Sequence, residues 1–281
     1  MPSIRFSLLS PTFTAGVDQS QPELRVPSIK GQLRWWTRAL LGNGKAEYDL
    51  FGGIQGRRNG YPDDDAVPGP FVFRLVTPNL RRAEAPLCPH DFDKGRRQAL
   101  QPAENAEFEL HWFPRLAARA EASAANLQKV IDAWLLLGAV GCRSNRAAGS
   151  VWRAGYQPNV TTFEQDIIDL KLPDHLAVRV LETDSEKLRE VATDTLQGPM
   201  VDNALGFVRG NNRKASPLKL KIGRFSDGNR LIAVFDMRLG RASADEFNRA
   251  AQQLSQSNKG LGRSLQQAFN ARPLTRATRQ T

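Results

Sequence analysis

The chain has 281 residues, of which 41% are hydrophobic, 24% charged and 8% aromatic. It is therefore long enough for about two globular domains and too apolar to be disordered as a whole. No apolar run approaches the roughly 18 residues of a membrane helix. The two cysteines, Cys88 and Cys142, and the three scattered histidines offer no zinc-ligand spacing. We expect a cytoplasmic protein without a secretory signal, a bound metal or a cofactor.

The charge of the chain is unevenly distributed. Lys and Arg number 39 against 29 Asp and Glu, which gives a net charge of +10. Nearly all of the excess lies in residues 203–281, which hold 15 basic and 4 acidic side chains. Such asymmetry indicates a polyanionic partner, with nucleic acid as the first candidate. A solvated basic face that keeps the protein soluble is the alternative.

The chain begins with a strand and a helix. Residues 4–8 alternate apolar and other side chains, as a strand does. Ser28 is expected to be the N-cap of a helix that stops at Gly42. The apolar face of this helix consists of side chains at helical spacing, namely Ile29, Leu33, Trp36 and Leu40.

The rest of the first half completes a recognisable order of elements. A polar stretch over 49–70 precedes a strand over 71–76, and 81–102 is expected to be a charged, mobile connection. Further on, the patterns predict a strand over 106–113, a helix over 120–140 that ends at Gly141, and a short strand at 151–152. Strand, helix, strand, strand, helix, strand is the order of a ferredoxin-like (RRM-like) βαββαβ module.

The second half repeats this order more weakly. It is expected to contain a strand over 177–181, a helix over 184–196, a hairpin of strands 218–222 and 231–237, and a helix from Ser243. We therefore predict an α+β protein built from two ferredoxin-like modules with antiparallel sheets. The first domain is placed at 1–160, and the second at 161–281 with a basic tail over 272–281.

Three groups of residues are candidates for RNA binding. Lys30, Arg34 and Arg38 form a row about 120° from the apolar stripe of the first helix, and no acidic side chain of that helix neutralises it. A solvated outer face is the alternative for this row. Trp35 beside it is expected to cover the edge of the core rather than to stack on a base.

The other two groups lie in loops and on a strand. The loop 141–150 carries Arg143, Asn145 and Arg146 among small residues that let a sugar-phosphate chain approach. A basic loop that only ends the preceding helix is the alternative. The densest basic segment holds Arg213, Lys214, Lys219 and Lys221, and would form a phosphate track unless these lysines merely protect an edge strand.

Catalytic groups are sparse. No Ser/His/Asp or Cys/His set has a supporting local signature. The acidic run Asp63–Asp65 is more typical of a solvated loop than of a Mg²⁺ site. Asp18, in the loop before the basic helix, is the one weak candidate for assisting metal-dependent RNA cleavage.

The segment Glu23–Leu40, followed by Glu47 and Leu50-Phe51-Gly52, resembles the N-terminal signature of the RAMP superfamily of CRISPR proteins. Within it, the chain is most similar to the first Cmr subunits of type III-B effector complexes. Ser10-Pro11 and Ala215–Leu218 match as well, and the loop 141–149 stands where RAMP proteins keep a glycine-rich loop, here with fewer glycines.

The resemblance implies two ferredoxin-like folds in a subunit of a crRNA-guided ribonucleoprotein that serves antiviral defence. Such a subunit contacts guide and target RNA near the crRNA 3′ region without cutting, beside a neighbouring RAMP subunit and away from membranes. The alternative is a RAMP ribonuclease that cleaves target RNA with Asp18. A free-standing RNA chaperone is a third reading, but no strand shows an RNP-type aromatic pattern.

Overall fold

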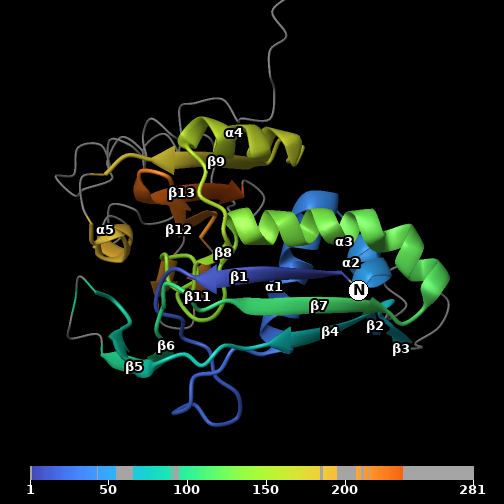
Figure 1. Cartoon of the computed structure of the whole chain (residues 1–281), viewed down its shortest axis with the longest axis horizontal. Helices are drawn as coiled ribbons and strands as arrows, with labels where there is room; N and C mark the ends of the chain where they lie inside the picture. The colour runs from blue at the N-terminus through green and yellow to red at the C-terminus, as the bar shows by residue number, and fades with distance from the viewer. Residues whose placement is uncertain are drawn as a thin grey trace, which may run out of the picture.

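The computed structural model describes residues 2–42, 44–54, 66–89, 91, 95–183, 186–194, 207–209, 212–214 and 216–236. The first half is built on a sheet of four antiparallel strands (Figure 1). In the order β4-β7-β1-β8 these are Phe71–Val76, Phe108–Pro114, Ser3–Leu8 and Val151–Arg153. Numbered along the chain, this is the order 2-3-1-4. The antiparallel ferredoxin-like module predicted from the pattern of elements is therefore confirmed.

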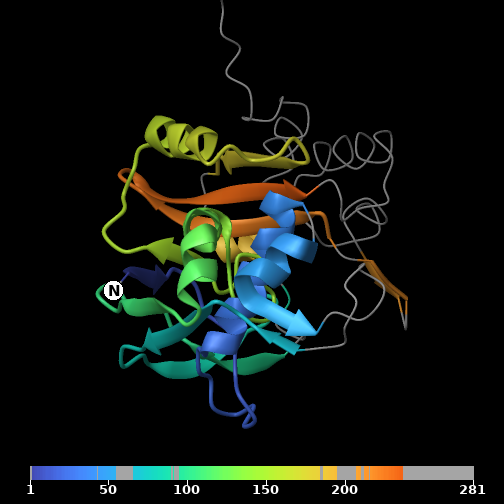
Figure 2. The same ribbon diagram turned by 90° about the vertical axis from the view of Figure 1, so that its right-hand side faces the viewer.

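Helices α1, Val26–Leu41, and α3, Ala117–Leu137, pack against this sheet, and α2, Gly44–Phe51, lies beside them (Figure 2). The predicted apolar stripe of α1 is buried throughout. The helix begins three residues earlier than predicted, because Val26 and Pro27 belong to its first turn and Arg25, not Ser28, is the N-cap. It ends as predicted at Gly42, whose left-handed φ of 77° suits glycine.

Three other boundaries differ from the prediction. Helix α3 ends at Leu137 rather than near Gly141, so the connection to β8 is longer than expected. The polar stretch over 49–70 holds the end of α2 and the short pair β2–β3, Gly52–Ile54 and Ala66–Pro68. The connection over 81–102 is largely a hairpin of β5, Arg82–Pro86, and β6, Arg96–Leu100. Its backbone ladder forms without an apolar period in the sequence, which is why the pattern did not indicate strands.

The second half contains a three-stranded antiparallel sheet in the order β12-β13-β9. These strands are Leu218–Phe225, Gly228–Asp236 and Leu176–Leu181, and the predicted hairpin between β12 and β13 is confirmed. Helix α5, Leu188–Asp194, packs on one face of this sheet. The order 2-3-1 repeats that of the first sheet. The helix expected from Ser243 and the basic tail lie outside the described residues.

Helix α4, Val160–Asp169, was not predicted. Asn159 caps it by accepting a hydrogen bond from the backbone N–H of Thr162 at 2.8 Å. Its short apolar period, Phe163 and Ile167, is buried in the core. The helix covers the region in which the sequence suggested only a boundary between domains.

One hydrophobic core runs through both halves. It includes Leu110 and Trp134 of the first half together with Val178 of β9 and Val234 of β13. The second sheet is therefore covered on both faces, by α5 on one side and by the first half on the other. Two short strands, β10 at Phe207–Arg209 and β11 at Asn212–Lys214, pair with each other. Among the described residues, no helix has the length and apolar character needed to cross a bilayer.

Candidate nucleic-acid interface

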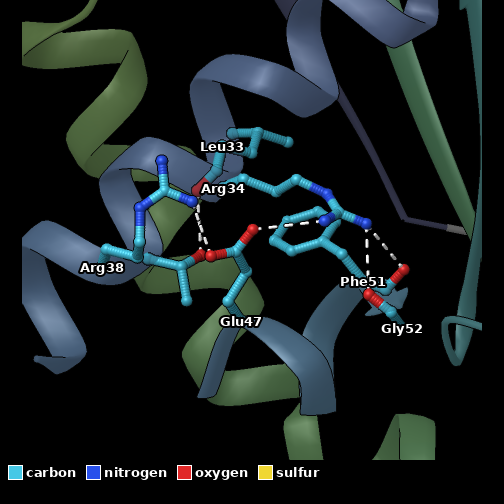
Figure 3. A network of polar contacts seen from close by, with 7 residues as sticks. Leu33, Arg34, Arg38, Glu47, Phe51 and Gly52 are labelled. Atoms are coloured by element: carbon cyan, nitrogen blue, oxygen red, sulfur yellow. Dashed lines mark hydrogen bonds and ion pairs between the residues drawn. The ribbon is translucent and has the colours of Figure 1, made fainter. Parts of the chain in front are cut away.

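The basic row on α1 is neutralised in part by the next helix. Glu47 of α2 accepts hydrogen bonds from Arg34 at 3.2 Å and from Arg38 at 2.5 Å (Figure 3). Arg34 also donates to the backbone oxygens of Phe51 and Gly52 at 3.3 and 3.1 Å. The sequence of α1 alone did not indicate this carboxylate, because folding brings it from a neighbouring helix to Arg34 and Arg38. Arg34 holds the end of α2, whereas Arg38 stays half-exposed.

Lys30, the third member of the row, lies against the sheet. Its Nζ is 5.9 Å from the centre of the Phe73 ring. Burial lowers the pKa of Lys30, and the nearby Arg34 adds to this effect. Within the described part of the chain, no carboxylate pairs with its ammonium group.

The lysines of β12 are not on an exposed face. Lys219 Nζ lies 3.2 Å from the centre of the Trp35 ring, and burial lowers its pKa to about 8. Lys221 is only 1% exposed. Its Nζ donates to the backbone oxygens of Leu135 at 3.0 Å and Val151 at 2.5 Å, and burial lowers its pKa well below the usual value.

The predicted phosphate track is therefore wrong at Lys221, which is enclosed, whereas Lys219 is only partly buried, against Trp35. The alternation of leucine and lysine in β12 resembles a strand with one wet face. In the fold, the lysine side of β12 packs on the first half and the leucine side packs on α5. Arg213 and Lys214 lie on β11, where Arg213 opposes Val208, but their side chains are outside the described residues.

The loop between α3 and β8, residues 138–150, is called the junction loop below. Its backbone is hydrogen-bonded to both halves of the molecule. On one side, Cys142 N–H donates to Phe13 O at 2.8 Å. On the other, Ala147 N–H donates to Leu220 O at 2.8 Å, and Leu220 N–H donates to Asn145 O at 3.2 Å. Asn145 and Arg146 therefore lie alongside the first strand of the second half's hairpin.

The backbone of the junction loop is tightly constrained. Gly149 has a left-handed φ of 59°, and a Cβ there would lie 1.9 Å from Val140 O. Arg143 is exposed and also left-handed, with φ of 61°. Arg146 is largely enclosed, and its Nη1 donates to Asn145 O at 3.3 Å. The loop thus presents one exposed and one enclosed arginine beside a rigid backbone.

Asp18 lies in the loop between β1 and α1, which projects from the body in both views (Figures 1 and 2). Its carboxylate accepts hydrogen bonds from Ser20 N–H at 2.9 Å and Ser20 Oγ at 2.6 Å. These hydrogen bonds lower its pKa. Its local role is to close a tight turn. The described residues contain no group of three or more potential metal ligands, and Asp63–Asp65 fall outside them.

Arg189 is a candidate that the sequence did not indicate. It comes from α5, and its guanidinium carbon lies 5.0 Å from the centre of the Phe13 ring. Its pKa is lowered to about 10, mainly by burial; Cys88 opposes this shift and the charge of Arg143 adds to it. No sequence signal marks it, because Phe13, Arg143 and Arg189 are brought together only by the tertiary fold.

The class of protein follows from the fold: an α+β protein with a ferredoxin-like first half and a second sheet packed against it. The model of the RAMP superfamily matches residues 5–152, slightly more than half of the sequence. The chain belongs to the RAMP superfamily, which confirms the resemblance noted in the sequence. No curated protein matches the sequence.

Solved structures show the same fold over nearly the whole chain. Cmr1 from Pyrococcus furiosus in its apo form is 16% identical, with a TM-score of 0.56 over 89% of this chain and 96% of that one. A chain from a type III-B Cmr-beta complex bound to cognate target RNA is 9% identical. Its TM-score is also 0.56, and the match covers 90% of this chain and 98% of that one. These likenesses establish the fold.

Proposed function

We propose that the protein is a non-cleaving RNA-binding subunit of a type III-B CRISPR effector complex. In this role it contacts guide and target RNA near the crRNA 3′ end, next to other RAMP subunits. Its membership of the RAMP superfamily and its full-length likeness to a chain of an RNA-bound Cmr complex support the proposal. The same role places the protein in the cytoplasm, where the complex meets foreign transcripts.

The observation that carries this proposal is the charge of the junction loop. Arg143 and Arg146 lie within the junction loop, between Gly141 and Gly149. Among the described residues, no carboxylate forms an ion pair with either arginine. Arginine side chains beside exposed backbone suit a sugar-phosphate chain, which they neutralise without reading its sequence. Arg38 and Lys30 add positive charge on α1.

Recovery of bound RNA from the native complex tests the proposal. A tagged chain is purified from its own cells after ultraviolet crosslinking, and the attached RNA is sequenced. We expect short RNAs with a uniform 5′ sequence and crosslinks concentrated toward their 3′ ends. RNA indistinguishable from that of an untagged strain would contradict the proposal, and crosslinks toward the 5′ end would contradict the assigned position.

A further inference from the structure

Phe13 brings the junction loop, α5 and the end of β5 together, because it is hydrogen-bonded to Cys142, lies under Arg189 and packs with Ala148 and Leu87. Three arginines belong to this region. Arg143 and Arg146 belong to the junction loop, and Arg189 belongs to α5. Arg189 Nη2 donates to the backbone oxygen of Leu87, just after β5, at 3.0 Å. One face of its guanidinium covers Phe13, so the side chain is held in place from two sides.

The protein leaves most donors of these arginines unused. A guanidinium has five N–H donors. Within the part of the chain that the structure describes, Arg189 and Arg146 each have one acceptor, Leu87 O and Asn145 O, and Arg143 has none. The Nε of Arg189 is buried without a partner. These donors are available to a ligand with several acceptor oxygens, after a small side-chain adjustment at Arg189.

The charges of the cluster are not compensated. The pKa of both Arg146 and Arg189 is lowered to about 10, mainly by burial, with a contribution from the charge of Arg143 that Cys88 partly opposes. Both stay protonated at neutral pH, so their desolvation and mutual repulsion remain as a cost to the folded state. A bound anion would remove much of that cost, which makes anion binding favourable here.

The backbone of the turn adds neutral donors. Among the described residues, no acceptor is found for the N–H groups of Arg143, Ser144 and Asn145. Arg143 is left-handed, and successive N–H groups around such a residue are typical of anion-binding turns. The arginine side chains of the junction loop and α5, and the backbone N–H groups of the turn, thus all favour an anionic ligand.

We propose that Arg143, Arg146 and Arg189 form a seat for a single phosphate group, and that a phosphodiester of bound RNA occupies it. The identity of this occupant rests on the proposed function. A phosphate offers several oxygens in the geometry that guanidinium forks match. Since Arg189 comes from the second half and Arg143 from the first, the phosphate would bridge the two.

Binding of a fluorescein-labelled oligouridylate to the full chain, measured by anisotropy over a range of salt, tests the seat. Arg189→Gln is compared with Arg74→Gln, which removes one charge from the exposed face of β4. We expect Arg189→Gln to weaken binding about tenfold and to reduce the salt slope by about 0.7, with Arg74→Gln close to wild type. Arg143→Gln, at an exposed position, should act in the same direction without affecting folding.

Thermal unfolding in the presence of inorganic phosphate is the second part of the test. At constant ionic strength set with chloride, phosphate should raise the melting temperature of the wild type and not that of Arg189→Gln. If RNA binds but the variants of Arg143 and Arg189 bind as tightly as Arg74→Gln, the seat is refuted and the proposed function stands. If RNA does not bind but phosphate protects only the wild type, the seat holds a free phosphate and the RNA role fails. No effect of phosphate and no RNA binding would overturn both.

Discussion

The ammonium group of Lys221 lies between the two halves of the molecule, where Leu135 and Val151 supply backbone oxygens as acceptors. Burial opposes its charge, and the two hydrogen bonds offset part of that cost. Lysine is rarely buried without such partners. The residue therefore contributes to the joining of the halves rather than to attraction of RNA, contrary to its expected role.

Charge reversal at this position tests its burial. Lys221→Glu places a carboxylate against two carbonyl oxygens and removes their donor, so we expect a loss of about 3–5 kcal/mol. For a chain of this size that lowers Tm by about 6–20 °C. Arg74→Glu, on the exposed face of β4, should change Tm little. Thermal unfolding followed by circular dichroism makes the comparison, and equal small effects would show that Lys221 is solvated.

Asp18 gives a residue-scale test of catalysis. Its carboxylate is occupied by hydrogen bonds from Ser20, and its turn is exposed. We expect Asp18→Ala, in the assembled complex with Mg²⁺ and complementary RNA, to leave the pattern of cleavage products unchanged. The disappearance of one product while RNA stays bound would establish the ribonuclease alternative instead.

At the scale of elements, Glu47 connects α1 to α2. It pairs with Arg34 and Arg38 one turn apart on α1, and Arg34 reaches on to the end of α2. This arrangement explains why a short, polar segment such as α2 is helical in the fold. Helices of this length are marginal by themselves and depend on tertiary contacts. The same carboxylate reduces the positive potential of α1.

Variants at this contact should affect stability and RNA affinity in opposite ways. Glu47→Gln weakens two ion pairs, so we expect a loss of stability of about 1 kcal/mol. It also removes a negative charge beside half-exposed Arg38, so RNA should bind more tightly and with a steeper salt dependence. Arg38→Gln should weaken binding. RNA affinities that do not change in either variant would show that the row serves only to attach α2.

At the scale of the whole molecule, the two halves share one core and are expected to unfold together. Trp152 of β8 stacks with Phe163 of α4 and lies close to Phe225 of β12. Gly223 of β12 lets the Trp152 ring approach, because a Cβ at position 223 would lie 2.8 Å from that ring and 2.7 Å from Ile232. The five tryptophans all lie before residue 160, so their fluorescence reports on the first half.

Unfolding in denaturant should therefore be a single transition, coincident by tryptophan fluorescence and by far-ultraviolet circular dichroism. Gly223→Val overpacks the interface, and we expect both curves to shift together by about 1–3 kcal/mol. At Gly228, the first residue of β13, an added Cβ meets open space, but the φ of 125° is strained for alanine. Gly228→Ala is therefore the comparison variant. It serves as a control for a local backbone effect. Two separated transitions in the wild type would contradict a shared core.

The order of the main strands and helices could be predicted because each carries its own apolar period. The stripe of α1, the alternation in β1 and the hairpin turn before β13 are all local signals that the fold retains. Elements without such a period, namely the β5–β6 hairpin and α2, could not be predicted. They depend on backbone pairing or on contacts from residues distant in sequence.

The sequence by itself determined the RAMP family, the ferredoxin-like order of the first half and the basic character of the junction loop. Only the tertiary structure decided which charges are free. It paired Arg34 and Arg38 with Glu47, placed Lys219 against Trp35, buried Lys221 under the first half, and brought Arg189 near Arg143. The physical reason is that periodicity fixes which side of an element is apolar, whereas the neighbours that cover its polar side come from elsewhere in the chain.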